Sequence, residues 1–391
     1  MKLSISIPID EWNPSRGGLE RYLERVCRSL TALGHRVTII CLRCSDGAAV
    51  PEGVRVELLS VPNFPRWLRE LRFAQEAAAA HRRSGRDVLY AVRHAYEADV
   101  YQPHGGCFRM AKRRALMHRS PVVRALRLAV GRLRPTVQVL QWLDREVFRR
   151  SPDVTLVSLS AQVEDDFRAM YPDVRFHFRR LYNGVDTDLF HDGDREERMS
   201  ELHARWNIGS GERVAVFLAH RFGPKGLAHA VTALASTSNW HLVVAGRSGV
   251  GVFERQAKQL GVAPRVHFAG PVSDSRALLA GADALVLPTY HDVCALVVLE
   301  ALACGTPVVT TRQSGSADLM RGSKGGRVLD APPQDSEIAV ALADIGSEWE
   351  AYHEAALELR SQLNWNDHFT QIEAVLMEAA RSQRDRAAAV E

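Results

Sequence analysis

The sequence predicts an α/β protein with two doubly wound domains, and three observations support this. The chain has 391 residues, which exceeds the usual size of a single hydrophobic core. Short apolar stretches alternate with helical patterns, as in βαβ units that build parallel sheets. The alternation pauses at a polar segment near residues 191–212 and then resumes. We therefore expect one domain over residues 1–185 and a second over 186–365.

In the first half, each expected strand is a short apolar run, and each expected helix is a longer stretch that follows a turn. We expect strands at residues 2–8, 36–42, 54–60, 87–91, 98–101, 154–158 and 179–182. We expect helices at 18–33, 68–84 and 161–171. Strands that are separated by helices in this way favour parallel pairing.

The second half repeats the alternation with shorter segments. Strands are expected at residues 213–219, 240–245, 266–269, 284–287 and 307–310. Helices are expected at 226–235, 253–260, 273–280 and 297–303, and a last helix runs from 366 to about 384. The two halves are alike in architecture only.

The composition is that of an ordinary globular protein, with 46% hydrophobic and 25% charged residues. Six cysteines are too few for a disulfide scaffold, and the Cys41/Cys44 pair is interpreted as reduced thiols. No apolar run approaches the roughly 18 residues that span a bilayer, and the N-terminus does not resemble a signal peptide. We expect a cytoplasmic protein.

The net charge of +4 is mild, but the basic residues are unevenly distributed. One stretch contains nine cations and no acid: Arg109, Lys112, Arg113, Arg114, Arg119, Arg124, Arg127, Arg132 and Arg134. On a helical wheel over residues 121–135, Arg124, Arg127 and Arg134 lie opposite an apolar face. That face comprises Val122, Leu126, Ala129, Val130 and Leu133.

Two interpretations of this stretch remain open. It is either a domain helix with an apolar core face, or a basic amphipathic helix on an anionic membrane surface. A packed helix could also present its arginines to lipid phosphates, so the two are compatible. Nucleic-acid binding is disfavoured because no aromatic platform is interleaved with the cations.

Ligands of open α/β sheets bind at the carboxyl ends of strands, beside helix N-termini. The first such loop ends in Gly17 and Gly18 at the start of a helix. Paired glycines allow a close approach of the backbone to a phosphate or a sugar, although a plain turn would look the same. The loop does not have the GxGxxG pattern, so a nicotinamide cofactor is not supported.

A second loop, residues 220–226, carries Arg221 and Lys225. A guanidinium and an ammonium at a strand end could neutralise a diphosphate leaving group, which is commonly worth about 3 kcal/mol per strong donor. The loop lacks the spacing of a Walker A motif.

The most informative stretch places Asp292 and Glu300 eight residues apart. Backbone N–H groups of Ala295, Leu296 and Val297 at a helix start could hold a phosphate. Glu300 would then accept hydrogen bonds from ribose hydroxyls, and Asp292 would face a transferred sugar. A glycosidase with the two acids as catalytic pair is disfavoured by the adjacent diphosphate cradle.

The fourth candidate is His104, followed by two glycines in a loop after a predicted strand. A lone histidine in such a loop is more often structural than functional.

The second half resembles the family-four retaining glycosyltransferases of the GT-B fold, from Asn183 to about Asp330. The matching pieces are Asn183–Asp186, Arg221 with Lys225–Gly226, Val266–Gly270, Ala282–Pro288 and Asp292 through Glu300 to Gly305-Thr-Pro307. The first half is similar more loosely, through residues 17–20 and His104. Among such enzymes, it looks most like bacterial lipopolysaccharide core glucosyltransferases. The family's first acid is usually Glu, whereas this chain has Asp292.

The resemblance implies two Rossmann-like domains facing across a cleft, with the last helix, about 366–391, packed back on the first domain. It implies catalytic roles for His104, Asp292, Glu300, Arg221 and Lys225. The implied donor-binding residues are Gly17, Gly18, Arg221, Lys225, Arg247, His267, Phe268, Ala295, Leu296, Val297 and Glu300. His104 would hydrogen-bond the donor sugar, and residues 267–270 would contact the base.

The implied activity is a metal-independent, retaining transfer of a hexose from a nucleotide-diphosphate sugar, UDP being the expected base. The implied acceptor is a lipopolysaccharide core or lipid-linked glycan, reached at the inner face of the cytoplasmic membrane. No cofactor and no metal are expected. The alternatives are a non-catalytic sugar-nucleotide-binding subunit and a mannosyltransferase that uses GDP-mannose.

Overall fold

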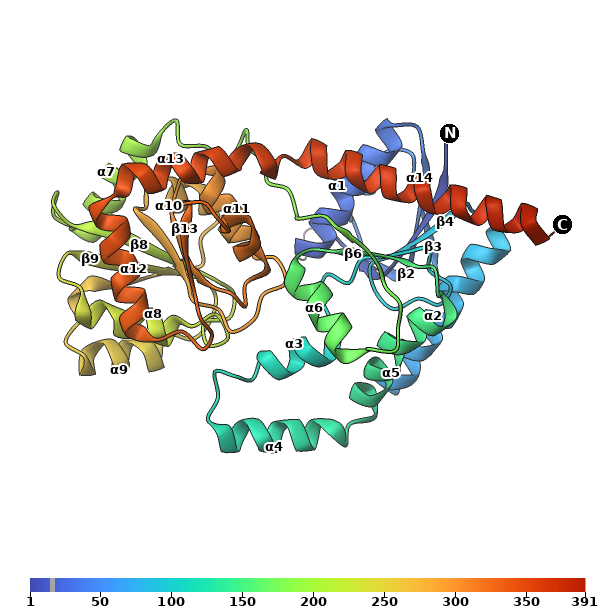
Figure 1. Ribbon diagram of the computed structural model, residues 1–391, viewed down its shortest axis with the longest axis horizontal. Coiled ribbons are helices and arrows are strands. Elements are labelled where there is room, and N and C mark those ends of the chain that lie inside the picture. Colours follow the sequence, from blue (N-terminus) through green and yellow to red (C-terminus); the bar gives the residue numbers. More distant parts are fainter. Residues whose placement is uncertain (15–17, 391) are drawn as a thin grey trace. The chain divides into compact units, whose positions relative to one another are not determined.

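The computed structural model describes residues 1–14 and 18–390, with side chains up to residue 386 (Figure 1). The chain divides into two compact units. Unit 1 comprises Met1–Lys112, Val122–Leu181 and Asn366–Glu391, and unit 2 comprises Arg113–Pro121 and Tyr182–Trp365. Each unit is built around its own parallel sheet, and each is described separately.

Unit 1 contains a seven-stranded parallel sheet in the order β3-β2-β1-β4-β5-β6-β7. The strands are β1 (Ser4–Trp12), β2 (Arg36–Cys44), β3 (Val54–Leu58), β4 (Val88–Ala91), β5 (Val100–Tyr101), β6 (Thr155–Ser158) and β7 (His177–Arg180). The order reverses between β1 and β4, which is the topological switch point of a doubly wound sheet. Gly18 begins the helix that comes after β1, and His104 lies in the loop after β5.

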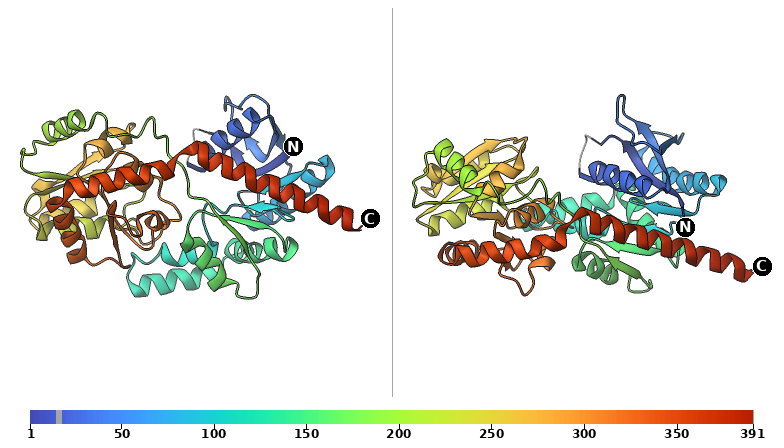
Figure 2. Two further views of the ribbon diagram at one scale, coloured as in Figure 1. Left: turned by 45° about the horizontal axis from the view of Figure 1, so that its top comes forward. Right: turned by 90° about the horizontal axis from the view of Figure 1, so that it is seen from above.

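Unit 1 also contains the helices α1 (Gly18–Ala32), α2 (Arg66–Ser84), α3 (Phe108–Arg114, which continues into unit 2), α4 (Pro121–Arg132), α5 (Pro135–Arg150), α6 (Ala161–Met170) and most of α14 (Trp365–Val390). Figure 2 shows α14 running along this unit to the C-terminus. Ile372, Leu376 and Ala380 recur every fourth position and are buried, so one face of α14 packs on unit 1. Glu373, on the same helix, accepts from His35 at 2.9 Å.

The amphipathic helix α4 exposes its apolar face. Val122 is 78% exposed, Leu126 63% and Leu133 79%, and the buried residue of α4 is Gly131. An ordinary domain helix would bury such a face. The interpretation of residues 121–135 as a helix with an apolar core face is therefore wrong.

Unit 2 contains a six-stranded parallel sheet in the order β10-β9-β8-β11-β12-β13. Its strands are β8 (Arg213–Leu218), β9 (Trp240–Ala245), β10 (Val266–Gly270), β11 (Ala284–Leu287), β12 (Val308–Thr311) and β13 (Gly326–Leu329). The strand order reverses between β8 and β11, so this pair marks the switch point.

The helices of unit 2 connect these strands. They are α7 (Arg195–Trp206), α8 (Leu227–Ala233), η1 (Leu234–Ser236), α9 (Gly251–Gln259), η2 (Ala263–Arg265), α10 (Ser275–Gly281), α11 (Leu296–Ala303), η3 (Gly315–Met320), α12 (Asp335–Ser347), α13 (Trp349–Arg360) and η4 (Ser361–Leu363). The polar segment near residues 191–212 is therefore no interruption, because most of it forms α7. The helix packs on α10 and buries Leu202.

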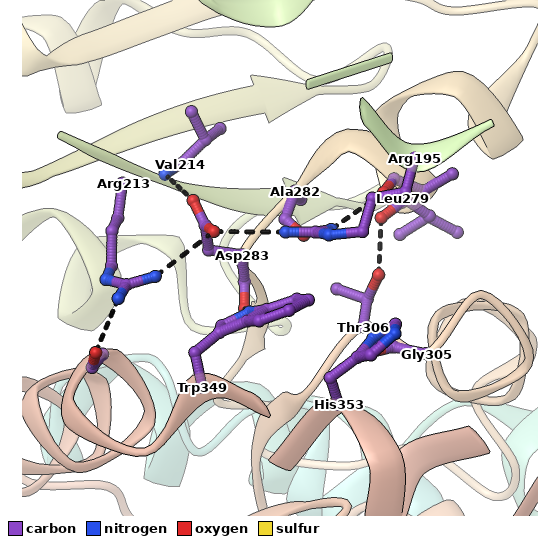
Figure 3. Close-up of polar contacts among 12 residues, drawn as sticks. Arg195, Arg213, Val214, Leu279, Ala282, Asp283, Gly305, Thr306, Trp349 and His353 are labelled. Atoms are coloured by element: carbon purple, nitrogen blue, oxygen red, sulfur yellow. Dashed lines mark hydrogen bonds and ion pairs between the residues drawn. The ribbon is translucent and has the colours of Figure 1, made fainter. Parts of the chain in front are cut away.

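A polar network lies at the amino ends of the unit 2 strands, around the buried carboxylate of Asp283 (Figure 3). One oxygen accepts from the backbone N–H of Val214 at 2.8 Å. The other pairs with Arg195 at 3.2 Å and with Arg213 at 3.5 Å. The ring of Trp349 lies under the Arg195 guanidinium, 4.1 Å away, and its Nε1 donates to the Asp283 carbonyl. These contacts tie α7, α13 and two strands together.

The predicted doubly wound α/β fold is confirmed, with a parallel sheet in each unit. All six cysteines are free, in agreement with the interpretation of Cys41 and Cys44 as thiols. Within residues 1–14 and 18–390, no helix is both long enough and apolar enough to cross a lipid bilayer.

Candidate functional site

The candidate site of unit 2 begins with the pairing of β8 and β11. The two strands are parallel neighbours, with Ala284 opposite Ala215 and Leu285 opposite Val216. Because their carboxyl ends meet at one edge of the sheet, the loops that follow them lie side by side. These loops carry the predicted cations and the predicted Asp292.

Backbone and side-chain contacts join the two loops. The N–H of Tyr290 donates to the carbonyl of Pro224 at 3.0 Å, and the Thr289 hydroxyl donates to the same oxygen at 3.3 Å. Lys225 Nζ donates to the carbonyl of His291 at 3.2 Å and forms an ion pair with Asp292. The structure therefore brings Lys225 and Asp292 together, at the carboxyl edge of the sheet.

Gly226 permits this close approach. Its φ of +84° lies in the left-handed region, and a Cβ at this position would lie 2.1 Å from the carbonyl oxygen of Pro288. Any other residue would clash with the backbone and adopt an unfavourable conformation. The glycine after Lys225 is thus a steric requirement of the paired loops.

Asp292 is held at the entrance to α11. Its N–H donates to the Gln313 carbonyl at 2.9 Å, and its own carbonyl accepts from Gly315 at 2.8 Å. The carboxylate oxygen Oδ1 accepts from the N–H of Cys294 at 3.2 Å. The backbone on both sides fixes the direction of the side chain.

The N-terminus of α11 follows immediately. Ala295 occupies the N-cap position without a side-chain cap, and Leu296 is the first helical residue. The first N–H groups of a helix have no acceptor within it, so this end favours an anion. Val298, Leu299 and Leu302 bury the helix in unit 2. Glu300 is half-buried, one turn from the start.

The loop with Arg221 is anchored by its neighbour Phe222, which is buried and packs edge-on against Phe217 and Phe253. Arg221 itself is exposed, and so is Arg247 in the loop after β9. The two guanidinium groups project from loops at the carboxyl edge of the same sheet.

His267 and Phe268, predicted to lie against a base, are on β10. His267 stacks on Trp206, with ring centroids 5.1 Å apart, and its Nε2 lies 2.9 Å from His241 Nδ1. Burial, with a contribution from His241, lowers the pKa of His267 to about 4. The imidazole of His267 therefore already contacts Trp206 and His241 of unit 2. Phe268 is half-buried.

Several residues at this edge were not predicted from the sequence. His229 lies 2.6 Å from Asp335 through Nδ1 and 2.6 Å from the Tyr290 hydroxyl through Nε2. These contacts fix Tyr290, whose backbone holds the Lys225 loop. A histidine inside a predicted helix gives no signal of such a role.

The segment Arg113–Pro121 also belongs to this edge of unit 2. The ring centroids of His118 and Tyr290 lie 6.3 Å apart. His118 also lies close to Gly223, where an added Cβ would be 3.1 Å from the Cδ2 of His118. His291 faces Arg114, Asp292 and Lys225, and its pKa is lowered to about 4, chiefly by burial and then by Arg114. The basic stretch thus contributes to the surroundings of Lys225.

In unit 1, Gly18 is the first residue of α1, and Gly17 lies outside the described residues. His104 follows β5, and its ring packs on that of Tyr22 at a centroid distance of 4.5 Å. The residue is partly accessible, but its Nε2 is buried and has no hydrogen-bond partner among the described residues. Burial, and then the neighbouring His368, lower the pKa of His104 to about 3, so the ring is neutral at pH 7.

Comparison with known families agrees with this architecture. Residues 199–361 match the family described as glycosyl transferases group 1, and residues 16–189 match glycosyltransferase family 4. With a Rossmann-like sheet in each unit, these matches identify the chain as a GT-B glycosyltransferase that carries group 1 and family 4 domains. The predicted family is therefore confirmed.

Among its relatives is the lipopolysaccharide glucosyltransferase WaaG of Escherichia coli (strain K12). The two are 26% identical over 342 residues, which cover 83% of this chain and 85% of WaaG. A D-inositol 3-phosphate glycosyltransferase of Catenulispora acidiphila is 34% identical over 203 residues, about half of each chain (47% and 46%).

Two solved structures illustrate the shared fold. The crystal structure of WaaG has a TM-score of 0.72 at 21% identity and covers 96% of this chain and 98% of its own. The structure of HepE from Anabaena in complex with UDP-glucose has a TM-score of 0.67 at 17% identity, with coverages of 96% and 100%.

Proposed function

We propose that this chain is a retaining, metal-independent hexosyltransferase that uses a UDP-sugar, most simply UDP-glucose. The proposed acceptor is a lipopolysaccharide-core or lipid-linked glycan. The observation that carries the proposal is the contact of Lys225 with Asp292 and His291 at the start of α11. WaaG, named for glucosyl transfer in lipopolysaccharide synthesis, and HepE, solved with UDP-glucose, support the choice of donor and acceptor class.

In this proposal the donor diphosphate lies between two groups of positive potential. One loop supplies the cations Lys225 and Arg221. The start of α11 supplies the backbone N–H groups of Ala295, Leu296 and Val297, which carry the partial positive charge of the helix N-terminus. Fixed donors of this kind stabilise negative charge as it develops on the leaving UDP, at about 3 kcal/mol per strong donor. Lys225 exchanges its contact with Asp292 for a phosphate oxygen when the donor binds.

Three polar side chains are proposed to bind the sugar part of the donor. Glu300 receives the ribose hydroxyls, and Asp292 reads hydroxyls of the transferred hexose. Because His104 is neutral at pH 7, its unpartnered Nε2 is suited to hydrogen-bond a sugar hydroxyl near the reacting carbon. Gly18 allows the backbone at the start of α1 to approach the phosphate.

The proposed reaction keeps the anomeric configuration. The acceptor hydroxyl attacks on the face from which UDP departs, and the leaving phosphate oxygen takes the acceptor proton. The protein then contributes positioning and fixed charge, which together account for most of the acceleration in such reactions.

The exposed apolar face of α4 supports a membrane-bound acceptor. Val122, Leu126 and Leu133 form that face, and Arg124 and Arg127 lie on the other side of the helix. We propose that α4 lies on the anionic inner face of the cytoplasmic membrane, with its apolar face among the acyl chains. Peripheral association would keep the enzyme close to a lipid-linked acceptor.

A thermal-shift panel of UDP, GDP, ADP and their sugar conjugates tests the donor. A ligand that binds the folded protein raises its Tm by mass action, so UDP and UDP-glucose are expected to give the largest shifts. Lys225→Ala should abolish the diphosphate shift. Lys324→Ala, which removes an exposed lysine paired with Glu348, is the matched control and should retain it. A full shift in Lys225→Ala would remove this lysine from the site, and a larger shift with GDP-mannose would favour the mannosyltransferase.

Co-sedimentation with vesicles tests the membrane proposal. Reversing the charge of Arg124 and Arg127 should weaken binding to vesicles with anionic lipid by at least tenfold at low salt, since each cation contributes about 1 kcal/mol near the surface. Replacing Leu126 and Leu133 with serine should weaken it further. Unchanged binding in all variants would contradict the proposal. Neutral vesicles provide the control for the charge term.

A further inference from the structure

A buried polar cluster in unit 1 links the C-terminal helix to the loop that carries His104. The Tyr22 hydroxyl on α1 lies 3.0 Å from Gln102 Oε1 and 3.0 Å from His368 Nε2 on α14. The Tyr90 hydroxyl also donates to Gln102 Oε1. All four side chains are buried, with Gln102 and Tyr90 at 0%, His368 at 3% and Tyr22 at 4% exposure.

The direction of these hydrogen bonds follows from the available hydrogens. Tyr22 and Tyr90 both donate to the amide oxygen of Gln102, and each phenol has a single hydrogen to give. Tyr22 therefore has none left for His368. Donation from Tyr22 to Gln102 requires the tautomer of His368 that carries its hydrogen on Nε2, 3.0 Å from the Tyr22 oxygen. In that tautomer His368 is the first donor of the chain of hydrogen bonds, and the Tyr22 and Tyr90 hydroxyls also lie 3.2 Å apart.

Tyr22 supports His104 in two ways. Its ring packs directly on the His104 ring, at a centroid distance of 4.5 Å and an interplanar angle of 59°. Its hydroxyl also contacts Gln102, which lies two residues before His104. The backbone N–H of Gln102 donates to the Ala91 carbonyl of β4 at 2.8 Å. Tyr22 thus contacts both the start of the loop, through Gln102, and the imidazole of His104.

We propose that His368 is a positioning residue for sugar transfer, acting through Tyr22 to hold the imidazole of His104. The inference rests on the proposed role of His104 in binding the donor sugar. The inference gives the last helix, α14, a part in holding His104 in place. Groups that must be held to a fraction of an ångström need rigid neighbours of this kind.

A purely structural role for His368 would have different consequences. Loss of a buried hydrogen bond alone would lower the stability and leave the reaction of the folded protein unchanged. A positioning role changes the state of the His104 ring and the rate of the reaction. Three variants separate the two: His368→Leu removes the donor, His368→Gln keeps an N–H donor, and Tyr22→Phe keeps the ring but loses the hydroxyl.

The first measurement requires no substrate. Imidazole ¹H–¹⁵N spectra of the full-length protein report the environment and tautomer of His104, assigned with His104→Gln. We expect displaced His104 signals in His368→Leu and Tyr22→Phe, and near-native signals in His368→Gln. Identical His104 signals in all three variants would overturn the inference.

The second measurement uses UDP-glucose turnover by the same proteins. His368→Leu and Tyr22→Phe are expected to lower kcat about tenfold with KM for UDP-glucose changed less than twofold, and His368→Gln should recover most of kcat. Glu373→Gln is the control. It alters the contact between α14 and His35, and it should leave kcat unchanged. An unchanged kcat in His368→Leu would refute the positioning role. If the unaltered protein does not turn over UDP-glucose, the proposed donor is wrong, while the spectra still decide the link between His368 and His104.

Discussion

Strands β8 and β11 of unit 2 are joined by charged groups at both ends, and the two ends differ in what surrounds the charges. At the amino end, the Asp283 side chain is 7% exposed and is matched by Arg195, Arg213 and the N–H of Val214. At the carboxyl end, the Lys225 and Asp292 side chains are 22% and 20% exposed and form one ion pair. The same pair of strands thus carries a closed network and an accessible one.

The difference separates a structural cluster from a functional one. Both oxygens of Asp283 are engaged by groups of the same unit, so the carboxylate has little capacity to bind a ligand (Figure 3). Lys225 has one carboxylate partner beside a helix N-terminus that also attracts anions. It can exchange that partner for a phosphate, because the exchange replaces one anionic partner of the ammonium with another.

The largest expected effect comes from opening the closed network. Asp283→Ala leaves Arg195, whose side chain is 13% exposed, without its carboxylate and removes an acceptor from the N–H of Val214, which together cost about 3–5 kcal/mol. We expect a corresponding fall in the urea concentration at the unfolding midpoint of unit 2. Tryptophan fluorescence measures this transition. Binding of UDP to the protein that remains folded should be unchanged.

The matched control is Asp330→Ala, which removes an ion pair with Arg312 whose two side chains are more than half exposed (65% and 66%). Its effect on unfolding should stay within about 0.5 kcal/mol. If Asp283→Ala left the stability intact and abolished UDP binding, the distinction between the two ends would be wrong.

A smaller effect is expected at the accessible end. Asp292→Asn removes the charge opposite Lys225 but keeps an oxygen that can accept from Cys294. We expect UDP to bind equally well or up to a few-fold more tightly, because Lys225 no longer has to leave a carboxylate. Transfer from UDP-glucose should fall at least tenfold, about 1.4 kcal/mol, because the acid is proposed to read the sugar.

Calorimetry with UDP and initial rates with UDP-glucose measure the two effects separately. Asp292→Glu, which restores the acid usual in the family, should retain transfer or change the preferred hexose. A loss of UDP affinity in Asp292→Asn would mean that the carboxylate serves to position Lys225.

The carboxyl-end site could be predicted because its parts are close in sequence or follow paired strands. Lys225 and Asp292 each come shortly after a strand, and the reversal of strand order places those strands side by side. The helix α7 could not be predicted, because it buries only Leu202 and its polar surface hides the helical period. The helices α12 and α13, which follow the last predicted strand, were not predicted either, although α12 buries Ile338, Leu342 and Ile345 at helical spacing.

Contacts between distant parts of the chain were also beyond prediction. Tyr22 and His368 are 346 residues apart, and no local pattern marks either of them. The partners of Asp283 come from α7 and β8, so its position was recognised only as part of a family motif. For α4, the amphipathic pattern was clear, but only the structure showed that the apolar face is uncovered.

The smallest predicted effect concerns acid stability at the accessible end. The pKa of His291 is about 4 in the folded protein, lowered by burial and by Arg114, against 6.5 for a free imidazole. The unfolded chain therefore binds more protons between pH 6.5 and 4, and the free energy of unfolding falls as the pH falls through this range. Between pH 6 and 5 the contribution of His291 is about 1 kcal/mol. His291→Gln should reduce the loss of stability over that interval by this amount in parallel urea titrations, and an unchanged loss would show that its ring is protonated or exposed in the folded state.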